Sequence, residues 1–360
     1  MISAAIVTSP GLQDVALAEL KKLIGVSGIV KTNYIFFKAK EIDVCKVAYR
    51  SQSATRVLAN PVELSSASLA DLENSFKNNA DIESYKKFTG DKVSFKIECD
   101  RFGYHNYKSV GASALLGKLI DGKLKAEIVN PDVLFYLLID SEKAFFGLDL
   151  CGFDLSKRYY KVFPSPSSIR GPSAYCISSL AEKPGLFLDP LCSSGEIVIE
   201  KALSESMISV RTYEKEKLGF TKMEAFSELA TKLFLEKRKK IKSRIYGYDP
   251  HMPNVHGAKK NAKVAGVQKS IRFGRCALEW LDTKFKENEV DSVATNALRC
   301  DEKQLDKLFY NLSYICSKKA KIIIAANPAV DVVAKKHSFA IDSSINIGRR
   351  PIEVYTLSKQ

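Results

Sequence analysis

Residues 187–200 read Phe-Leu-Asp-Pro-Leu-Cys-Ser-Ser-Gly-Glu-Ile-Val-Ile-Glu. An apolar run ends at Asp189-Pro190, small residues follow as a turn, and an amphipathic helix then begins. This order predicts a strand, a tight turn and a helix, which is the unit that opens a cofactor-binding α/β domain. The same pattern occurs in α/β domains that bind nothing, so the surrounding chain has to distinguish the two interpretations.

Three more strand-like segments follow, as in a domain that alternates strands and helices. The first, Ile245–Tyr248, precedes Asp249-Pro250 and a helix rich in small residues, and further strands are expected near residues 271–275 and 290–296. An acidic residue that closes the second strand can accept hydrogen bonds from both ribose hydroxyls of an adenosine. Asp249 fits this role, and it also fits the role of N-cap for the helix that follows.

These segments resemble the motifs of class I S-adenosylmethionine methyltransferases that modify exocyclic amines in RNA. The first motif of those families reads roughly Asp-Pro-x-Cys-Gly-Ser-Gly-Thr, and Asn261-Ala-x-x-Ala265-Gly266 matches the helix after the second. The resemblance implies an α/β fold, with a Rossmann-like sheet that is mostly parallel and has an antiparallel edge strand. It also implies S-adenosyl-L-methionine as the cofactor, bound by Asp189, Pro190, Cys192, Ser194, Gly195, Asp249 and Cys276.

Two departures from the family pattern fall on cofactor positions. Ser193 stands where the family has glycine, and its Cβ would crowd a ligand or strain the turn. Cys276 stands where relatives carry an aspartate that meets the adenine amine, and a thiol is a poorer acceptor than a carboxylate. The cofactor contacts of this chain are therefore expected to be weaker than those of its relatives.

The third departure falls on the catalytic position, where the family carries Asn-Pro-Pro and an aromatic residue. This chain has Asn296-Ala-Leu-Arg299 instead. The resemblance implies that Asn296 and the next carbonyl accept hydrogen bonds from the target amine, and that Arg299 replaces the ring that stacks on the flipped base. A second Asn-Pro pair, Asn327-Pro328, comes one strand too late for this role.

The charge balance indicates a polyanionic partner. The chain has 360 residues, with 55 Lys and Arg against 41 Asp and Glu, and a formal net charge of +14. Such an excess favours binding to nucleic acid through long-range attraction and counterion release. The alternative is a Lys-rich, solvated surface without a specific partner.

The N-terminal half resembles a THUMP domain, an RNA-binding module of tRNA- and rRNA-modifying enzymes, preceded by an α+β ferredoxin-like companion. The matching segments are Arg101-Phe-Gly103, Ser109, Asn130-Pro-Asp132 and residues 147–161. The resemblance implies binding of tRNA or another structured RNA without an obligate protein partner. The residues expected to contact RNA phosphates are Arg101, Lys108, Lys157, Arg158 and Lys161.

The resemblance implies the domains of the chain, and composition predicts the connection between them. We expect a ferredoxin-like domain over residues 1–62, a THUMP domain over 63–161, a Pro- and Ser-rich linker over 162–180, and the methyltransferase domain over 181–360. A strongly basic helix is expected over Glu224–Lys242, either as a solvated face or as an RNA contact. The chain is expected to end in a hairpin around Gly348.

Cysteine usage and the N-terminus indicate a cytoplasmic protein that does not contact membranes. The 8 cysteines include no Cys-x-x-Cys pair, and the first residues lack the features of a signal peptide. Cys192, Cys276, Cys300 and His251 are expected at the same rim of the sheet. A metal or redox cluster is the alternative to buried thiols there, but no close-spaced ligands support it, so no metal is expected.

The sequence thus predicts an S-adenosylmethionine-dependent tRNA methyltransferase that acts on the N2 amine of guanine. The competing prediction is a catalytically inactive protein that keeps the same fold and binds RNA without methyl transfer. A methyltransferase acting on amines in DNA would share the sheet, but it would leave the THUMP-like half without a role.

Overall fold

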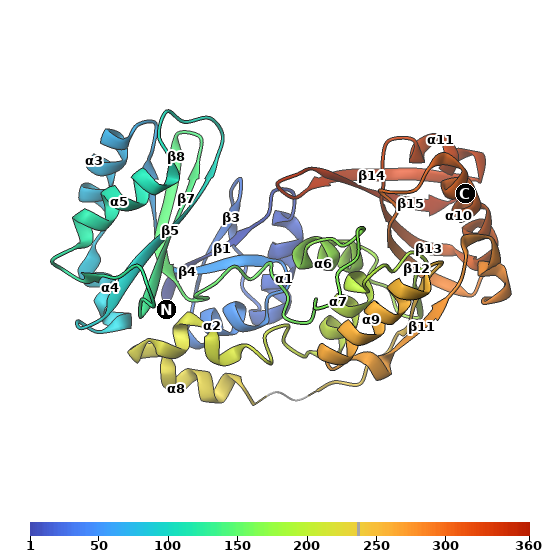
Figure 1. The fold of residues 1–360 in the computed structure, drawn as a ribbon, viewed down its shortest axis with the longest axis horizontal. Helices are drawn as coiled ribbons and strands as arrows, with labels where there is room; N and C mark the ends of the chain where they lie inside the picture. Colours follow the sequence, from blue (N-terminus) through green and yellow to red (C-terminus); the bar gives the residue numbers. More distant parts are fainter. Residues whose placement is uncertain (236–237) are drawn as a thin grey trace. The chain divides into compact units, whose positions relative to one another are not determined.

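The computed structural model describes residues 1–235 and 238–360. The chain divides into two compact units. Figure 1 shows the chain as a ribbon coloured along the sequence from blue to red. The first unit comprises residues 1–8, 17–155 and 212–235, and the second comprises residues 9–16, 156–211 and 236–360. Helix α1 (Gln13–Ile24) crosses the division between residues 16 and 17. No described helix is long and apolar enough to cross a bilayer.

The described part of the first unit forms one eight-stranded sheet in the order β2-β3-β1-β4-β8-β7-β5-β6. Its strands are β1 (Ile2–Thr8), β2 (Ile29–Val30), β3 (Tyr34–Ala39), β4 (Ala54–Ser65), β5 (Ser94–Phe102), β6 (Lys125–Ala126), β7 (Val133–Asp140) and β8 (Lys143–Asp149). Its helices are α2 (Glu41–Arg50), α3 (Leu69–Asn79), α4 (Ile82–Thr89), α5 (Ser109–Ile120) and α8 (Glu224–Leu233).

Strand β4 makes this sheet continuous across residue 62, where a domain boundary is predicted. It pairs with β1 on one side and with β8 on the other, and its register with β8 shifts between Ala59 and Val62. Asn60 at the shift has a φ of 44°, and Pro61 follows it. Proline has no amide hydrogen for the ladder, so a bulge is where it fits. The division of this half into two domains therefore stays a prediction.

The described part of the second unit forms a seven-stranded sheet in the order β11-β10-β9-β12-β13-β15-β14. Strands β9 to β13 in this row are parallel to one another, and β15 runs antiparallel to both β13 and β14. The antiparallel strand predicted near the edge is confirmed, one place in from the edge strand β14. The strands are β9 (Leu186–Asp189), β10 (Arg244–Asp249), β11 (Ile271–Arg275), β12 (Val290–Asn296), β13 (Cys316–Ala325), β14 (Phe339–Ile347) and β15 (Ile352–Lys359).

Helices cover both faces of this sheet and bury its central strands. They are α6 (Gly171–Leu180), α7 (Glu196–Ser206), α9 (Met252–Val264), α10 (Glu302–Ile315) and α11 (Val330–Lys336). In β9, Leu186 and Leu188 pack into one apolar core, and Phe187 packs into the other. A parallel strand buried on both faces has to be apolar throughout, which is why its sequence shows no alternation.

The basic helix predicted over Glu224–Lys242 is wrong in its length. Helix α8 ends at Leu233, residues 238–242 are not helical, and residues 236 and 237 lie outside the described part of the chain. Closely spaced like charges destabilise a helix, and the basic run here offers few acidic partners. A helix is also expected over Ser173–Leu180, in the second half of the linker, and α6 is found there, beginning at Gly171-Pro172 with proline in the first turn.

Residues 10 and 11 are built into the second unit beside its C-terminal hairpin. The amide of Gly348 donates to the carbonyl of Pro10 over 2.8 Å. Gly11 has a φ of 79°, and a Cβ placed there would lie 1.9 Å from the carbonyl oxygen of Asn346. A short N-terminal segment is therefore part of a unit that is otherwise made by the C-terminal half of the chain.

A buried ion pair links the segment before α6 to α7. The Nε of Arg158 donates to Oε1 of Glu200 over 2.7 Å, NH2 donates to Oε2 over 3.3 Å, and the hydroxyl of Tyr160 also donates to Oε1 over 2.7 Å. The side chains of Arg158 and Glu200 are 1% and 0% exposed. The prediction that Arg158 contacts an RNA phosphate is therefore wrong, because its guanidinium is enclosed and already neutralised.

We expect the Glu200→Ala substitution to lower the free energy of unfolding by about 3 to 5 kcal/mol, because it leaves the charge of Arg158 buried without its counterion. The double variant Arg158→Met/Glu200→Leu removes both charges and should recover most of this loss. Urea denaturation followed by the fluorescence of Trp280, the sole tryptophan and a residue of the second unit, measures both. A double variant no more stable than Glu200→Ala would contradict this account.

Asp189, the last residue of β9, is a second buried acid in this unit. It accepts a hydrogen bond from the hydroxyl of Thr295 in β12 over 2.7 Å and one from the amide of Leu191 over 3.2 Å. Burial raises the pKa of Asp189 from 3.8 to about 8, and the neighbouring carboxylates of Asp249 and Glu196 add to the shift. The folded protein therefore holds a proton on Asp189 at neutral pH that the unfolded chain has already released.

It follows that stability falls as the pH rises through the folded-state pKa of Asp189. Between pH 7 and 9 we expect a loss of about 1 kcal/mol in the free energy of unfolding, measured by urea denaturation at each pH. The Asp189→Asn variant keeps an oxygen that can accept from Thr295 but has no proton to lose. Its stability should change less over this interval, and an equal pH dependence in both proteins would assign the effect to other groups.

Candidate functional site

The parallel strands of the second unit bring the predicted site residues to one edge of its sheet. Strand β9 pairs with β10 and with β12, and β10 also pairs with β11, so the four strands end side by side. Asp189, Asp249 and Asn296 are the last residues of their strands, and Cys276 follows the end of β11. In open sheets of this type, ligands bind in the crevice outside the carboxyl ends of the strands.

The turn after β9 is held in a shape that favours glycine at two positions. Gly195 has a φ of 89°, and a Cβ there would lie 3.0 Å from the Cβ of Ala258 in α9. Ser193 has a φ of 52°, also in the left-handed region. A serine in this conformation costs about 1 kcal/mol relative to glycine. The expected strain at Ser193 is therefore present, and the turn keeps its shape in spite of it.

The carboxylate of Asp249 is largely used by the protein itself. Oδ1 accepts from the amide of His251 over 2.9 Å and from Nδ2 of Asn254 over 3.0 Å, and Oδ2 accepts from the amide of Ser193 over 3.0 Å. A carboxylate offers about four acceptor positions, so one on Oδ2 remains for a ligand. Asp249 thus fits one ribose hydroxyl of S-adenosylmethionine as it stands, and it also fixes the start of α9.

The two cysteines among the predicted cofactor residues are neutral thiols. Cys192 is 2% exposed and Cys276 is 4% exposed. Burial raises the pKa of both thiols. The Sγ of Cys276 donates to the carbonyl of Ala277 over 3.4 Å, and a thiol sulfur is only a weak acceptor for an adenine amine. Cys276 shapes the wall of the site more than it binds a ligand.

A serine-rich segment, residues 163–168, lies against the turn and against Asn296. The hydroxyl of Ser165 bonds to that of Ser193, and the hydroxyl of Ser168 lies 2.5 Å from that of Ser194. The backbone carbonyl of Ser167 accepts from Nδ2 of Asn296 over 2.9 Å. The sequence prediction missed this segment, because its prolines and serines are typical of an exposed linker. Only the three-dimensional structure shows that Ser165 and Ser168 lie opposite Ser193 and Ser194.

Asn261 holds this segment in place. Its side chain is completely buried, and Oδ1 accepts from the amides of Val162 and Phe163 over 3.1 and 2.9 Å. Its Nδ2 donates to the carbonyls of Phe163 and Ser194, both over 2.9 Å. One amide on α9 therefore joins the serine-rich segment to the turn after β9. This gives a physical role to the asparagine of the second motif.

The predicted catalytic residues occupy the loop after β12. Oδ1 of Asn296 accepts from the amide of Leu298 over 3.3 Å, and the carbonyl of Ala297 accepts from the amide of Cys300 over 2.9 Å. Each oxygen keeps one lone pair, so both can still accept from an amine. Arg299 is exposed on the same loop. The loop lacks the two prolines of the family pattern, and these hydrogen bonds hold its shape instead.

One charged residue of the site was not foreseen. Glu196, the first residue of α7, is 3% exposed and accepts from the hydroxyl of Ser194 over 2.8 Å. The ammonium of Lys161 lies 3.1 Å from the same oxygen and donates to the carbonyl of Ile169 over 2.7 Å. Lys161, predicted to contact RNA, is thus engaged inside the second unit.

Three more residues are predicted to contact RNA phosphates. Lys157, in the second unit, and Lys108, at the start of α5 in the first unit, are both exposed. Arg101 is partly buried in β5, and its guanidinium donates to the carbonyl of Tyr107. Their role toward RNA stays a prediction.

The chain is similar in sequence to known methyltransferases. Residues 158–319 match the UPF0020 family model, an RMKL-like methyltransferase domain. The chain is 27% identical to the tRNA (guanine(6)-N2)-methyltransferase of Methanocaldococcus jannaschii, with 94% of each chain covered. It is 26% identical to the ribosomal RNA large subunit methyltransferase K/L of Aliivibrio fischeri, over 74% of this chain and 40% of that protein.

A solved structure shares the fold over the whole length. The structure of TrmN from Thermus thermophilus superposes with a TM-score of 0.68 at 20% identity, and the alignment covers 100% of both chains. Residues 158–319 of this chain are therefore similar in sequence to an RMKL-like methyltransferase domain, and the fold of the chain is shared with a solved structure.

Proposed function

We propose that this protein is an S-adenosylmethionine-dependent RNA methyltransferase that methylates the exocyclic N2 amine of a guanine in tRNA. The relatives with this printed activity include one that aligns along nearly the entire chain, which supports the tRNA assignment over an rRNA one. The observation that carries the proposal is the placement of Asn296. It ends the strand next to β9, with its amide group fixed and one oxygen lone pair free.

The residues at the sheet edge have distinct roles toward the cofactor. S-adenosylmethionine supplies a methyl group on a positively charged sulfur, which a neutral amine can attack. Asp249 would accept from a ribose hydroxyl, and the turn of Ser193, Ser194 and Gly195 would hold the cofactor beside the end of β9. Asp189, protonated and hydrogen-bonded to Thr295, keeps the ends of β9 and β12 together under this turn.

Asn296 orients the target amine. Its Nδ2 is bound to the carbonyl of Ser167, so the amide cannot flip, and Oδ1 stays available to accept an N–H of the base. The carbonyl of Ala297 accepts the second N–H in the same way. The nitrogen lone pair would then point away from both acceptors, toward the methyl group that the cofactor would supply. The surplus proton leaves to water afterwards, so the site needs no strong base.

A second function remains a candidate because of the serine-rich segment. Its hydroxyls bond to Ser193 and Ser194, which are the same groups that a cofactor would meet at the turn. In an inactive RNA-binding protein these bonds would persist, and the turn would stay closed to the cofactor. In the enzyme, the hydroxyls of Ser165 and Ser168 would either move away from the turn or form hydrogen bonds to the cofactor. Cofactor binding therefore separates the two functions.

The Asn296→Ala variant should lose methyl transfer by about 100-fold or more, because the amine is no longer held with its lone pair toward the methyl group. Its affinity for tRNA should be unchanged. Transfer of a labelled methyl group to tRNA and a filter-binding assay measure the two quantities. Gln268→Ala removes an exposed amide just before β11 begins, and this control should retain activity. Equal losses of methylation and of RNA binding in Asn296→Ala would remove the proposed role.

Isothermal titration with S-adenosylmethionine and S-adenosylhomocysteine should give saturable binding to the wild type and none to Asp249→Ala. That variant loses the acceptor for ribose and the contact that shapes the turn. The control His256→Ala changes an exposed residue of α9, the helix that follows Asp249, and should bind normally. Ser193→Gly, free of the strain at this position, should bind at least as tightly as the wild type. A folded wild type that binds tRNA but neither ligand would support the inactive alternative.

A further inference from the structure

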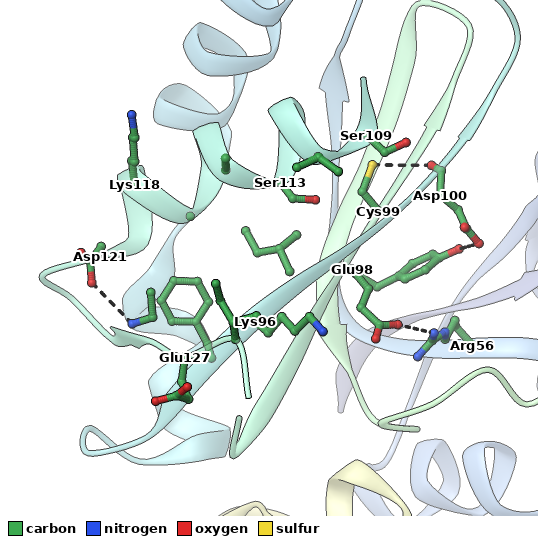
Figure 2. A pocket seen from close by; sticks show the side chains of 18 residues that line it. Arg56, Lys96, Glu98, Cys99, Asp100, Ser109, Ser113, Lys118, Asp121 and Glu127 are labelled. Carbon is green, nitrogen blue, oxygen red and sulfur yellow. Dashed lines mark hydrogen bonds and ion pairs between the residues drawn. The ribbon is translucent and has the colours of Figure 1, made fainter. Parts of the chain in front are cut away.

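The first unit carries a groove along the free edge of its sheet. The groove has a volume of about 720 Å³ and lies between β5 and α5. Its walls are residues 95–100 of β5, one side of α5, Asp121 after that helix, and residues 126–128, and Arg56 and Tyr136 complete the lining. Figure 2 shows these side chains from close by, with the helix above the strand. None of these residues belongs to the site of the second unit.

Most of the outer edge of β5 has no partner strand among the described residues. β6 pairs only with Ser94 and Phe95, and the carbonyl of Phe95 accepts from the amide of Glu127 over 2.9 Å. Backbone groups alternate along a strand, so those of Ile97 and Cys99 point to the same outer side as those of Phe95. The groove runs along this edge, because six consecutive β5 residues line it from both faces of the strand.

The two sides of the groove differ in character. The side chains of Phe95 and Ile97 are buried toward the core, and the thiol of Cys99 is placed near Ser109 and Ser113 of α5. On the opposite face of the strand, Glu98 accepts from Arg56 over 2.6 Å, and Asp100 accepts from the hydroxyl of Tyr136 over 2.7 Å. A strand placed beside β5 would thus meet an apolar helix on one face and carboxylates on the other.

The charge in the groove is opposite to that of the whole chain. Its lining carries four acidic residues, Glu98, Asp100, Asp121 and Glu127, against three basic ones, Arg56, Lys96 and Lys118. Arg56 also donates to the buried Asp149 over 2.6 Å, so its single positive charge is shared between Asp149 and Glu98. The chain as a whole has a net charge of +14. With one more carboxylate than cations, such a lining favours ammonium or guanidinium groups over phosphates.

We propose that this groove binds an extended segment of a partner protein, which adds a strand to the free edge of β5. The segment alternates apolar and basic side chains. Its backbone pairs with Ile97 and Cys99, its apolar side chains pack on Val110, Ala114 and Gly117 of α5, and its Lys or Arg side chains face Glu98 and Asp100. Strand addition in a groove between a strand and a helix is an established mode of peptide recognition. The proposal is independent of the methyl-transfer site.

The test uses the full-length protein and a fluorescent peptide in which Val and Lys alternate. Fluorescence anisotropy should show saturable binding, while the same peptide with Glu in place of Lys, or with a central proline, should not bind. Gly117→Phe should weaken binding at least about tenfold, equal to about 1.4 kcal/mol, because the ring fills the groove. A Cβ at Gly117 meets no atom within 4 Å, so the variant is expected to fold.

Gly111→Phe is the matched control. It lies on the same helix, a Cβ there also meets no atom within 4 Å, and Gly111 does not line the groove. Hydrogen exchange should show new protection of the amides of Ile97 and Cys99 when the peptide is bound. Asp100→Asn keeps an acceptor for Tyr136 and should weaken the Lys peptide more than a Val-Ser peptide.

Three results would overturn the proposal. They are the absence of binding at millimolar peptide, equal binding to Gly117→Phe and Gly111→Phe, and stronger binding of a single-stranded oligonucleotide that Gly117→Phe abolishes. The first would mean that the charges along β5 serve only to keep a free edge from associating. The last would make the groove part of an RNA surface.

Discussion

The parallel pairing of β9 with β10 on one side and with β12 on the other is the constraint on which the second unit depends. Parallel strands all end at the same edge of a sheet, so the residues that follow them meet there whatever their separation in the sequence. Asp189, Asp249 and Asn296 come from positions 60 and 47 residues apart and still face one crevice. The hydrogen bond from Thr295 to Asp189 then fixes two of these strand ends directly.

The site tolerates its unusual residues because each has found a local partner. Ser193 keeps the left-handed conformation that glycine would adopt more easily, and its hydroxyl is bound to Ser165. The loop of Asn296 lacks two prolines but is closed by the bonds of Ala297 and Leu298. Asn261 connects these adjustments, since its one buried amide holds both the serine-rich segment and the turn. Local hydrogen bonds therefore hold the turn and the loop at the positions where the family pattern has glycine and proline.

The sequence predicted what short-range patterns encode. Apolar runs gave the parallel strands, and the residues that follow them gave the edge of the site. It could not predict features that depend on distant partners. Glu200 lies 42 residues from Arg158, so a basic residue that looked exposed is enclosed. The serine-rich segment looked like a linker because its partners, Ser193, Asn261 and Asn296, are remote in the chain. The helix that begins at Glu224 is shorter than predicted, because the basic run after Leu233 places like charges close together and a helix there would be destabilised.

The inclusion of residues 9–16 in the second unit bears on how the protein is made. During synthesis, domains usually fold as they leave the ribosome, from the N-terminus onward. Here the pairing of β4 with β8 has to wait until residue 149 has emerged, although β4 is complete at residue 65. Pro10 meets Gly348 only when almost the entire chain is out. The second unit can therefore be completed only after residue 348 has been synthesised. A fragment that begins at residue 156 lacks residues 9–16, which belong to this unit.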